Sequence, residues 1–190
     1  MARPGFDPLQ ARTIRDAFRA EGIEFLLLGK GAAILMGFPG TTQDVDVFLP
    51  KSAPNGEKVV VALGRLGFEL SDIQKGEIVR GKDFIQLKSG PFDLDLIYAP
   101  DGLPDYGIVK ARSIEIEGYP LVRISDIIAS KRATGREKDR LDLPLLEAFE
   151  RVFRLHEAGL DRPRPLPQRD FPPGHERGDR SVEEGYGPER

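Results

Sequence analysis

Two copies of one short acidic pattern are the strongest chemical signal in this sequence. Asp44 and Asp46 alternate with valines, and Asp93 and Asp95 alternate with leucines. Side chains of an extended strand alternate between its two faces, so the two acids of each pair lie on one face. If the two strands pair in one sheet, four carboxylates meet on one surface, which is unfavourable unless a cation or a proton compensates. Mg²⁺ is the usual compensator where carboxylates also meet phosphates.

Together with the residues before it, this pattern indicates nucleotidyl transfer. The glycine turn Gly29–Gly31 follows a predicted buried strand, and backbone amides at such a turn can approach a triphosphate closely. Asp44 and Asp46 are the candidates to bind the metal ions on that triphosphate. Asp95 is the candidate to complete a second metal site and to help deprotonate the attacking hydroxyl, with Asp93 in reserve.

Composition limits the chemistry further. The 190 residues, 39% of them apolar, suffice for one domain with appendages. With no cysteine and two histidines, any metal must have oxygen ligands. No stretch approaches the ~18 uninterrupted apolar residues of a membrane span, and the N-terminus lacks a basic region followed by an apolar one. We therefore expect a soluble, cytoplasmic protein with no membrane partner, and the net charge of −3 predicts no general attraction to nucleic acid.

Apolar periodicity and turn residues predict an α/β (α+β) domain over residues 1–158. Asp7 is expected to cap the first helix and Asn55 the third. We expect helices over 8–21, 32–36, 56–66, 105–111, from 125 to a break at Gly135, and over 138–158. We expect strands over 24–28, 44–49, 68–70, 77–80, 83–88, 92–98, 113–117 and 119–122. The remaining residues, 159–190, are rich in proline, glycine and charge, and we expect a disordered tail there.

Three longer segments contain these motifs. They run LLLGKGAAILMGFPGTTQDVDVFL, FDLDLIY and RISDIIASKRATGREKDRLDLPLL. Over about residues 22–150 the chain resembles the minimal nucleotidyltransferases of the polymerase-beta type, and within them it is most similar to the AbiEii toxin class of abortive-infection proteins. The resemblance implies a nucleotidyltransferase-like mixed β-sheet flanked by helices, with C-terminal helices. It also implies an enzyme that moves a nucleoside monophosphate from a nucleoside triphosphate to a hydroxyl acceptor with two Mg²⁺ ions.

The resemblance also assigns roles to residues. It puts Gly29 and the acids Asp44, Asp46 and Asp95 in the catalytic positions, and the three acids would be the metal ligands. Lys131 is similar in position to a lysine expected near the nucleotide. The candidate nucleotide-binding residues are therefore Gly29, Lys30, Gly31, Thr42 and Lys131. The same matched stretch holds three further charged residues without a definite role: Arg136, Lys138 and Asp139.

Two departures from the family pattern leave alternatives open. Lys30 stands where the family usually has the second small residue of its turn, and Gly40 stands where an arginine often precedes the threonine. Lys30 either contacts a phosphate itself or obstructs the turn. One alternative is therefore a non-catalytic nucleotide-binding or protein-interaction module on the same fold. Another is a toxin–antitoxin component that acts on tRNA or a protein and has an antitoxin partner.

Other nucleotide motifs fit poorly. The run Gly29–Ile34 is a damaged GxGxxG because its third small position holds isoleucine, and the acids follow too soon for a ribose-binding carboxylate. A phosphate-binding Walker loop also fails, because Lys30 has neither a glycine five residues before it nor a Ser or Thr after it.

Overall fold

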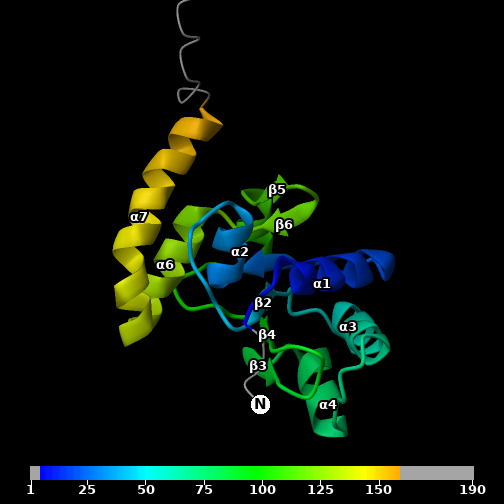
Figure 1. Cartoon of the computed structure of the whole chain (residues 1–190). Helices are drawn as coiled ribbons and strands as arrows, with labels where there is room; N and C mark the ends of the chain where they lie inside the picture. Colours follow the sequence, from blue (N-terminus) through cyan, green and yellow to red (C-terminus); the bar gives the residue numbers. More distant parts are fainter. Residues whose placement is uncertain (1–4, 159–190) are drawn as a thin grey trace, which may run out of the picture.

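A six-stranded mixed sheet lies at the centre of the structure, a computed structural model that describes residues 5–158 (Figure 1). The strand order is β3-β4-β2-β1-β6-β5. The strands are β1 (Leu26–Leu28), β2 (Val45–Phe48), β3 (Phe84–Leu87), β4 (Leu94–Ile97), β5 (Ile114–Ile116) and β6 (Tyr119–Leu121). β2 runs parallel to β4 and antiparallel to β1, and β1 runs parallel to β6. The predicted fold class, a mixed sheet flanked by helices, is confirmed.

Seven helices of the described residues surround this sheet. They are α1 (Pro8–Ala20), α2 (Gly29–Leu35), α3 (Ala53–Arg65), α4 (Asp72–Arg80), α5 (Tyr106–Ala111), α6 (Ile124–Thr134) and α7 (Glu137–Glu157). α3 packs against α4, and α6 packs against α7 on the other side of the molecule (Figure 1). The predicted C-terminal helices are therefore present, and they form a layer outside α2.

Local signals set several helix ends as predicted. The Asp7 side chain accepts a hydrogen bond from the Leu9 amide at 2.8 Å, and Gln10 Oε1 accepts one from the Asp7 amide at 3.2 Å. This reciprocal cap satisfies amides that have no partner inside α1. Farther along the chain, Gly135 has φ +59° and ends α6 at the predicted break.

Two predicted strands are wrong. The segment predicted as a strand over 77–80 belongs to α4, which begins with a cap between Ser71 and Gln74 and ends at Gly81 with φ +68°. No strand forms over 68–70. Cap residues at both ends, together with i, i+4 hydrogen bonding, outweigh the short apolar run of Ile78 and Val79 that suggested a strand.

The starts of two helices also differ from the predictions. The strand ends before Gly29 as expected, but α2 begins directly at Gly29, so residues 29–31 form its first turn and the helix starts before the predicted residue 32. Asn55 does not cap α3, which begins at Ala53. Instead Asn55 is buried, and its side-chain amide exchanges two hydrogen bonds with the backbone of Glu24, at 2.8 and 3.1 Å. It therefore ties α3 to the chain that enters β1.

The core follows the alternation of the two acidic strands. Val45 and Val47 of β2 lie opposite Leu94 and Leu96 of β4, and all four side chains are buried. The acids between them are paired in the same register, which positions them as neighbours on the other face. Burial of these aliphatic side chains therefore fixes where the carboxylates lie.

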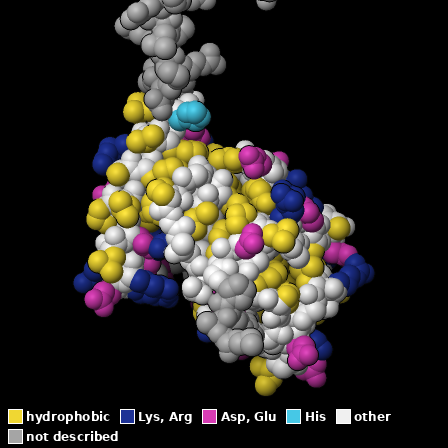
Figure 2. All heavy atoms as spheres, in the orientation of Figure 1, with side chains coloured by type: hydrophobic (Ala, Val, Ile, Leu, Met, Phe, Trp, Pro, Cys, Tyr) yellow, Lys and Arg dark blue, Asp and Glu magenta, His cyan; other side chains and the backbone are white. Residues whose placement is uncertain are grey.

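Beyond the core, α7 has an exposed apolar face. Hydrophobic side chains gather on the surface over this helix (Figure 2). The exposed ones are Leu141, Leu145, Val152 and Leu155.

No helix within residues 5–158 is both long and apolar enough to span a bilayer. The predicted disordered tail, 159–190, lies outside the described residues.

Candidate active site

The parallel pairing of β2 with β4 sets Asp46 directly beside Asp95. Asp44 lies just before β2, in the loop that leads into the strand. All three acids line one pocket of about 520 Å³. The same pocket is lined by most of the predicted nucleotide-binding residues: Gly29, Lys30, Thr42 and Lys131. The three acids therefore converge on one side of the molecule, together with two lysines.

Gly29 and Asp46 are in direct contact, and only glycine fits at this position. Gly29 has φ +71°, a backbone conformation that side chains disfavour. A Cβ atom on Gly29 would collide with the Asp46 carboxylate, since it would lie 2.8 Å from Cγ and closer still to Oδ2. The start of α2 therefore packs against the carboxylate, and Gly29 gives Asp46 the room that it occupies.

Burial and mutual repulsion disfavour the ionised forms of two of these acids. Burial raises the pKa of Asp46 to about 7, with further contributions from Asp95 and Asp44. Burial and then the charge of Asp44 raise the pKa of Asp95 to about 6. Lys131 and Lys138 oppose the shift of Asp46 but do not cancel it. The carboxylates are therefore short of positive charge, which a divalent cation would supply.

The chemistry of the donor set fits Mg²⁺. Asp95 is only 7% exposed, and its Oδ1 atom is buried with no hydrogen-bond partner. Such an atom is costly unless something binds it, and Mg²⁺ takes carboxylate oxygens of this kind. Within residues 5–158, however, no three His, Cys, Asp or Glu side chains are arranged as a metal-binding group. The acids face one pocket, and their side chains would have to rotate to share an ion.

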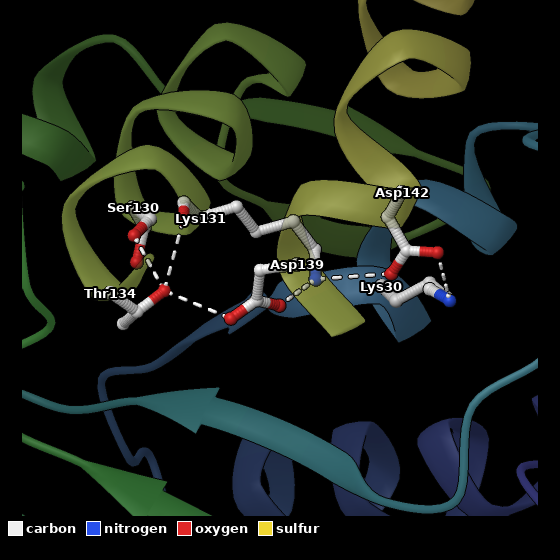
Figure 3. A network of polar contacts seen from close by, with 6 residues as sticks. All are labelled: Lys30, Ser130, Lys131, Thr134, Asp139 and Asp142. Atoms are coloured by element: carbon white, nitrogen blue, oxygen red, sulfur yellow. Dashed lines mark hydrogen bonds and ion pairs between the residues drawn. The ribbon is translucent and has the colours of Figure 1, made fainter. Parts of the chain in front are cut away.

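A network of lysines and acids forms the opposite wall of the pocket (Figure 3). Lys30 Nζ lies 2.6 Å from Asp142 Oδ1, and Lys131 Nζ lies 2.6 Å from Asp139 Oδ1. Burial pushes the pKa of Asp139 upward, but the hydrogen bond and charge of Lys131 and a hydrogen bond from Thr134 outweigh it and leave this pKa below its usual range. Asp139 is therefore ionised at neutral pH and holds Lys131 at the pocket.

The remaining predicted residues lie in different places. Thr42 lines the pocket, and its carbonyl accepts a hydrogen bond from the Phe6 amide at 2.9 Å. Gly31 is not a lining residue and instead packs against the Phe6 ring. Asp93, the reserve acid, does not line the pocket either. Gly40 abuts the Phe38 ring, where a Cβ would come within 2.8 Å. Glycine at position 40, where the family pattern often has an arginine, thus fits the close packing against the Phe38 ring.

Sequence reasoning missed other residues that line the pocket. Arg136, Lys138 and Asp139 were matched without a role, and Asp142 was not singled out at all. Asp139 and Asp142 are three residues apart on α7, so they share one face of the helix. That spacing is the signal that could have found Asp142. Across the pocket, the start of β3 and the loop after β4 add further lining residues that no sequence motif marked: Asp83, Phe84, Pro100 and Asp101.

Comparison with known proteins identifies the fold. No family model matches the chain, and no curated protein matches it significantly. The antibiotic-resistance factor ANT(2'')-Ia has a similar structure, with a TM-score of 0.50 and 17% sequence identity over 82% of this chain and 97% of that one. The chain has a nucleotidyltransferase-like fold. A provisionally assigned nucleotidyltransferase of Thermotoga maritima gives a TM-score of 0.41 at 15% identity over 82% and 93% of the two chains, too low to carry an argument.

The contact between Gly29 and Asp46 predicts the effect of a single methyl group. Gly29→Ala should displace the carboxylate and weaken stabilisation of the protein by Mg²⁺ with nucleotide, measured as the shift in Tm. Gly67→Ala is the matched control, because Gly67 also has a positive φ, of +86°, but nothing lies within 4 Å of its added Cβ. Gly67→Ala should lose roughly 1 kcal/mol of unfolding free energy from backbone strain, and Gly29→Ala should lose more, because its clash with the carboxylate adds to the same strain. Equal ligand-induced shifts in the two variants would contradict this assignment.

The raised pKa of Asp46 predicts a pH-dependent stability. Between the ordinary aspartate value of 3.8 and about 7, the folded protein binds more protons than the unfolded chain, so the unfolding free energy falls as pH rises through this window. Asp46→Asn removes that cost. In EDTA, the variant should gain on the order of 1–3 kcal/mol near pH 8 and little near pH 4, measured by urea unfolding. A gain that is independent of pH, or one shared by Asp105→Asn, an exposed control outside the pocket, would refute the prediction.

Proposed function

We propose that this chain is a Mg²⁺-dependent nucleotidyltransferase, with its activity in one domain over residues 1–158. It would move a nucleoside monophosphate from a nucleoside triphosphate to a hydroxyl acceptor. The observation that supports this most is the pairing of Asp46 with Asp95 on adjacent parallel strands, both facing a pocket whose other wall holds Lys30 and Lys131. Acids beside lysines in one concave site suit a substrate that arrives as a metal-bound polyphosphate.

The residues of the pocket divide the work of this reaction. Asp44, Asp46 and Asp95 would hold the divalent ions, whose chemistry is to neutralise the triphosphate and to lower the pKa of the acceptor hydroxyl. The acceptor oxygen forms a bond to the α-phosphorus, the bond from that phosphorus to the bridging oxygen breaks, and pyrophosphate leaves. Asp95 would also take the proton of the acceptor hydroxyl, with the carboxylate oxygen that does not bind an ion.

The lysines would supply the electrostatic stabilisation. Lys30 extends from the start of α2 and Lys131 from α6, so they approach the pocket from two elements. Lysine ammonium groups bind phosphate oxygens as point charges and offset the negative charge that moves onto the leaving pyrophosphate. Lys30 would then contribute a phosphate contact at the position where the resembled family usually has a small residue.

We also propose the finer assignment to an AbiEii-like toxin with an antitoxin partner and tRNA or a protein as acceptor. The supporting observation is that the matched stretch after the sheet contributes Lys131, Arg136, Lys138 and Asp139 to the pocket wall. In the resemblance to the family, this stretch is matched in addition to the acidic strands. Its basic side chains suit an acceptor that carries phosphate groups.

The two acids of the second copy of the pattern provide an internal test of the reaction. Asp95→Asn should lower transfer of radiolabel from α-labelled nucleotide by on the order of 10³-fold, because it removes both a metal ligand and the proton acceptor. Asp93→Asn, two residues away and outside the pocket, should retain activity within a few-fold. Total RNA and the purified protein itself serve as acceptors. Full activity of Asp95→Asn, or equal losses in both variants, would overturn the mechanism.

Expression in a bacterial host tests the toxin assignment. Induction of the wild-type chain should stop growth, because modification of tRNA or of an essential protein halts translation or metabolism. Asp46→Asn, produced to the same level, should leave growth unchanged, since it lacks the catalytic carboxylate. Normal growth with the wild type would count against the toxin and leave the transfer reaction to the labelling assay. Arrest by both proteins would show that the toxicity does not come from catalysis.

A further inference from the structure

Asp142 lies between the two lysines of the pocket and binds each with a different oxygen (Figure 3). Its Oδ1 is 2.6 Å from Lys30 Nζ, and its Oδ2 is 3.3 Å from Lys131 Nζ. The exposed fractions of the three side chains are 19%, 22% and 13%, so water screens these contacts incompletely. One carboxylate of α7 therefore fixes the separation of two ammonium groups that come from α2 and α6.

The two lysines depend on Asp142 to different degrees. Lys131 has a second partner in Asp139, at 2.6 Å, and Asp139 in turn accepts a hydrogen bond from Thr134. For Lys30, Asp142 is the one ion-pair partner within residues 5–158. Removal of the Asp142 charge would leave Lys131 anchored but would release Lys30. A released lysine turns its ammonium group toward water, because its flexible stem allows this and partial burial of an unpaired charge is unfavourable.

We propose that Asp142 is a positioning residue, which holds the Lys30 ammonium group at the pocket wall so that it meets the phosphates of a bound nucleotide. This inference rests on the proposed function. An ammonium group has three N–H donors, and in the structure Lys30 uses one of them on Asp142. The other two remain for phosphate oxygens, so nucleotide and Asp142 bind Lys30 together. The ordering of this long side chain is then already complete before the nucleotide arrives.

This role explains the departure at Lys30. A long cationic side chain at the second position of the turn could swing across the pocket and obstruct it. The chain carries the matching counter-charge 112 residues later, on the face of α7 that looks onto α2. The pair of Lys30 and Asp142 thus converts a residue that could block the turn into a fixed phosphate contact.

A double-mutant cycle tests the proposal. We would measure Kd by calorimetry for the α,β-methylene analogues of ATP, GTP, CTP and UTP with Mg²⁺, which bind but are not transferred. Lys30→Met and Asp142→Asn should each weaken binding about five- to tenfold. The double variant should bind no more weakly than the weaker single variant, because each change removes the same contact. Asp142→Glu keeps the charge and should recover part of the affinity.

Glu147→Gln is the matched control for helix packing. Glu147 also lies on α7 and pairs with α6, through Arg132 at 2.7 Å, but it is outside the pocket. Glu147→Gln should leave the nucleotide affinity within about twofold of the wild-type value. Unfolding midpoints of all variants would identify any variant that fails to fold, and the neutral Asp142→Ser would then replace Asp142→Asn in the cycle.

Three results would overturn the proposal. Multiplicative losses in the double variant would mean that Lys30 and Asp142 act independently, and tighter binding by Asp142→Asn would mean that Asp142 competes with phosphate. A loss in Glu147→Gln as large as that in Asp142→Asn would point to helix packing alone. The proposed function fails in a different way, because the wild type would then bind none of the four analogues, and this inference would fall with it.

Discussion

The candidate active site depends on one electrostatic constraint, the placement of Asp46 and Asp95 side by side on parallel strands in poorly hydrated surroundings. Burial of the alternating valines and leucines of β2 and β4 imposes this placement, because the register that buries them leaves the acids no other face. The aliphatic core thus supplies the free energy that holds two like charges together. Folding forces the charges together, and a cation, a proton or a nearby lysine must then compensate them.

Other features of the pocket make sense as responses to that constraint. Gly29 lacks a side chain where the Asp46 carboxylate needs the space. Lys131 and Lys138 lower the cost of ionising Asp46, but its pKa still rises to about 7. The lysines cannot complete the compensation, because Lys131 is already engaged by Asp139 and Asp142. The pocket would therefore gain from an added cation, and in the proposed reaction the triphosphate that accompanies this cation would meet the lysine wall.

The sequence predicted those parts of the structure that depend on local periodicity. Alternation along residues 44–49 and 92–98 was enough to predict the two strands that pair Asp46 with Asp95, although Asp93 lies before β4 and outside the pocket. Capping residues such as Asp7 and Gly135 set helix ends. The strand predicted over 77–80 failed, because a short apolar run fits a buried strand or a helix equally well and the caps of α4 decide between them. Asn55 looked like a cap, yet it satisfies the backbone of Glu24, a partner that only the tertiary fold supplies.

The same limit explains which site residues could be predicted. Asp44, Asp46 and Asp95 belong to repeated motifs, whereas Asp142 has no motif of its own and becomes meaningful only beside Lys30. Their pairing spans 112 residues, and no periodicity links positions so far apart. A departure from a family pattern was visible at Lys30, but its counterpart was not. The unusual charge at the start of α2 is thus best understood through the opposite charge that the fold brings to it, because an ammonium group in a half-buried wall requires a partner.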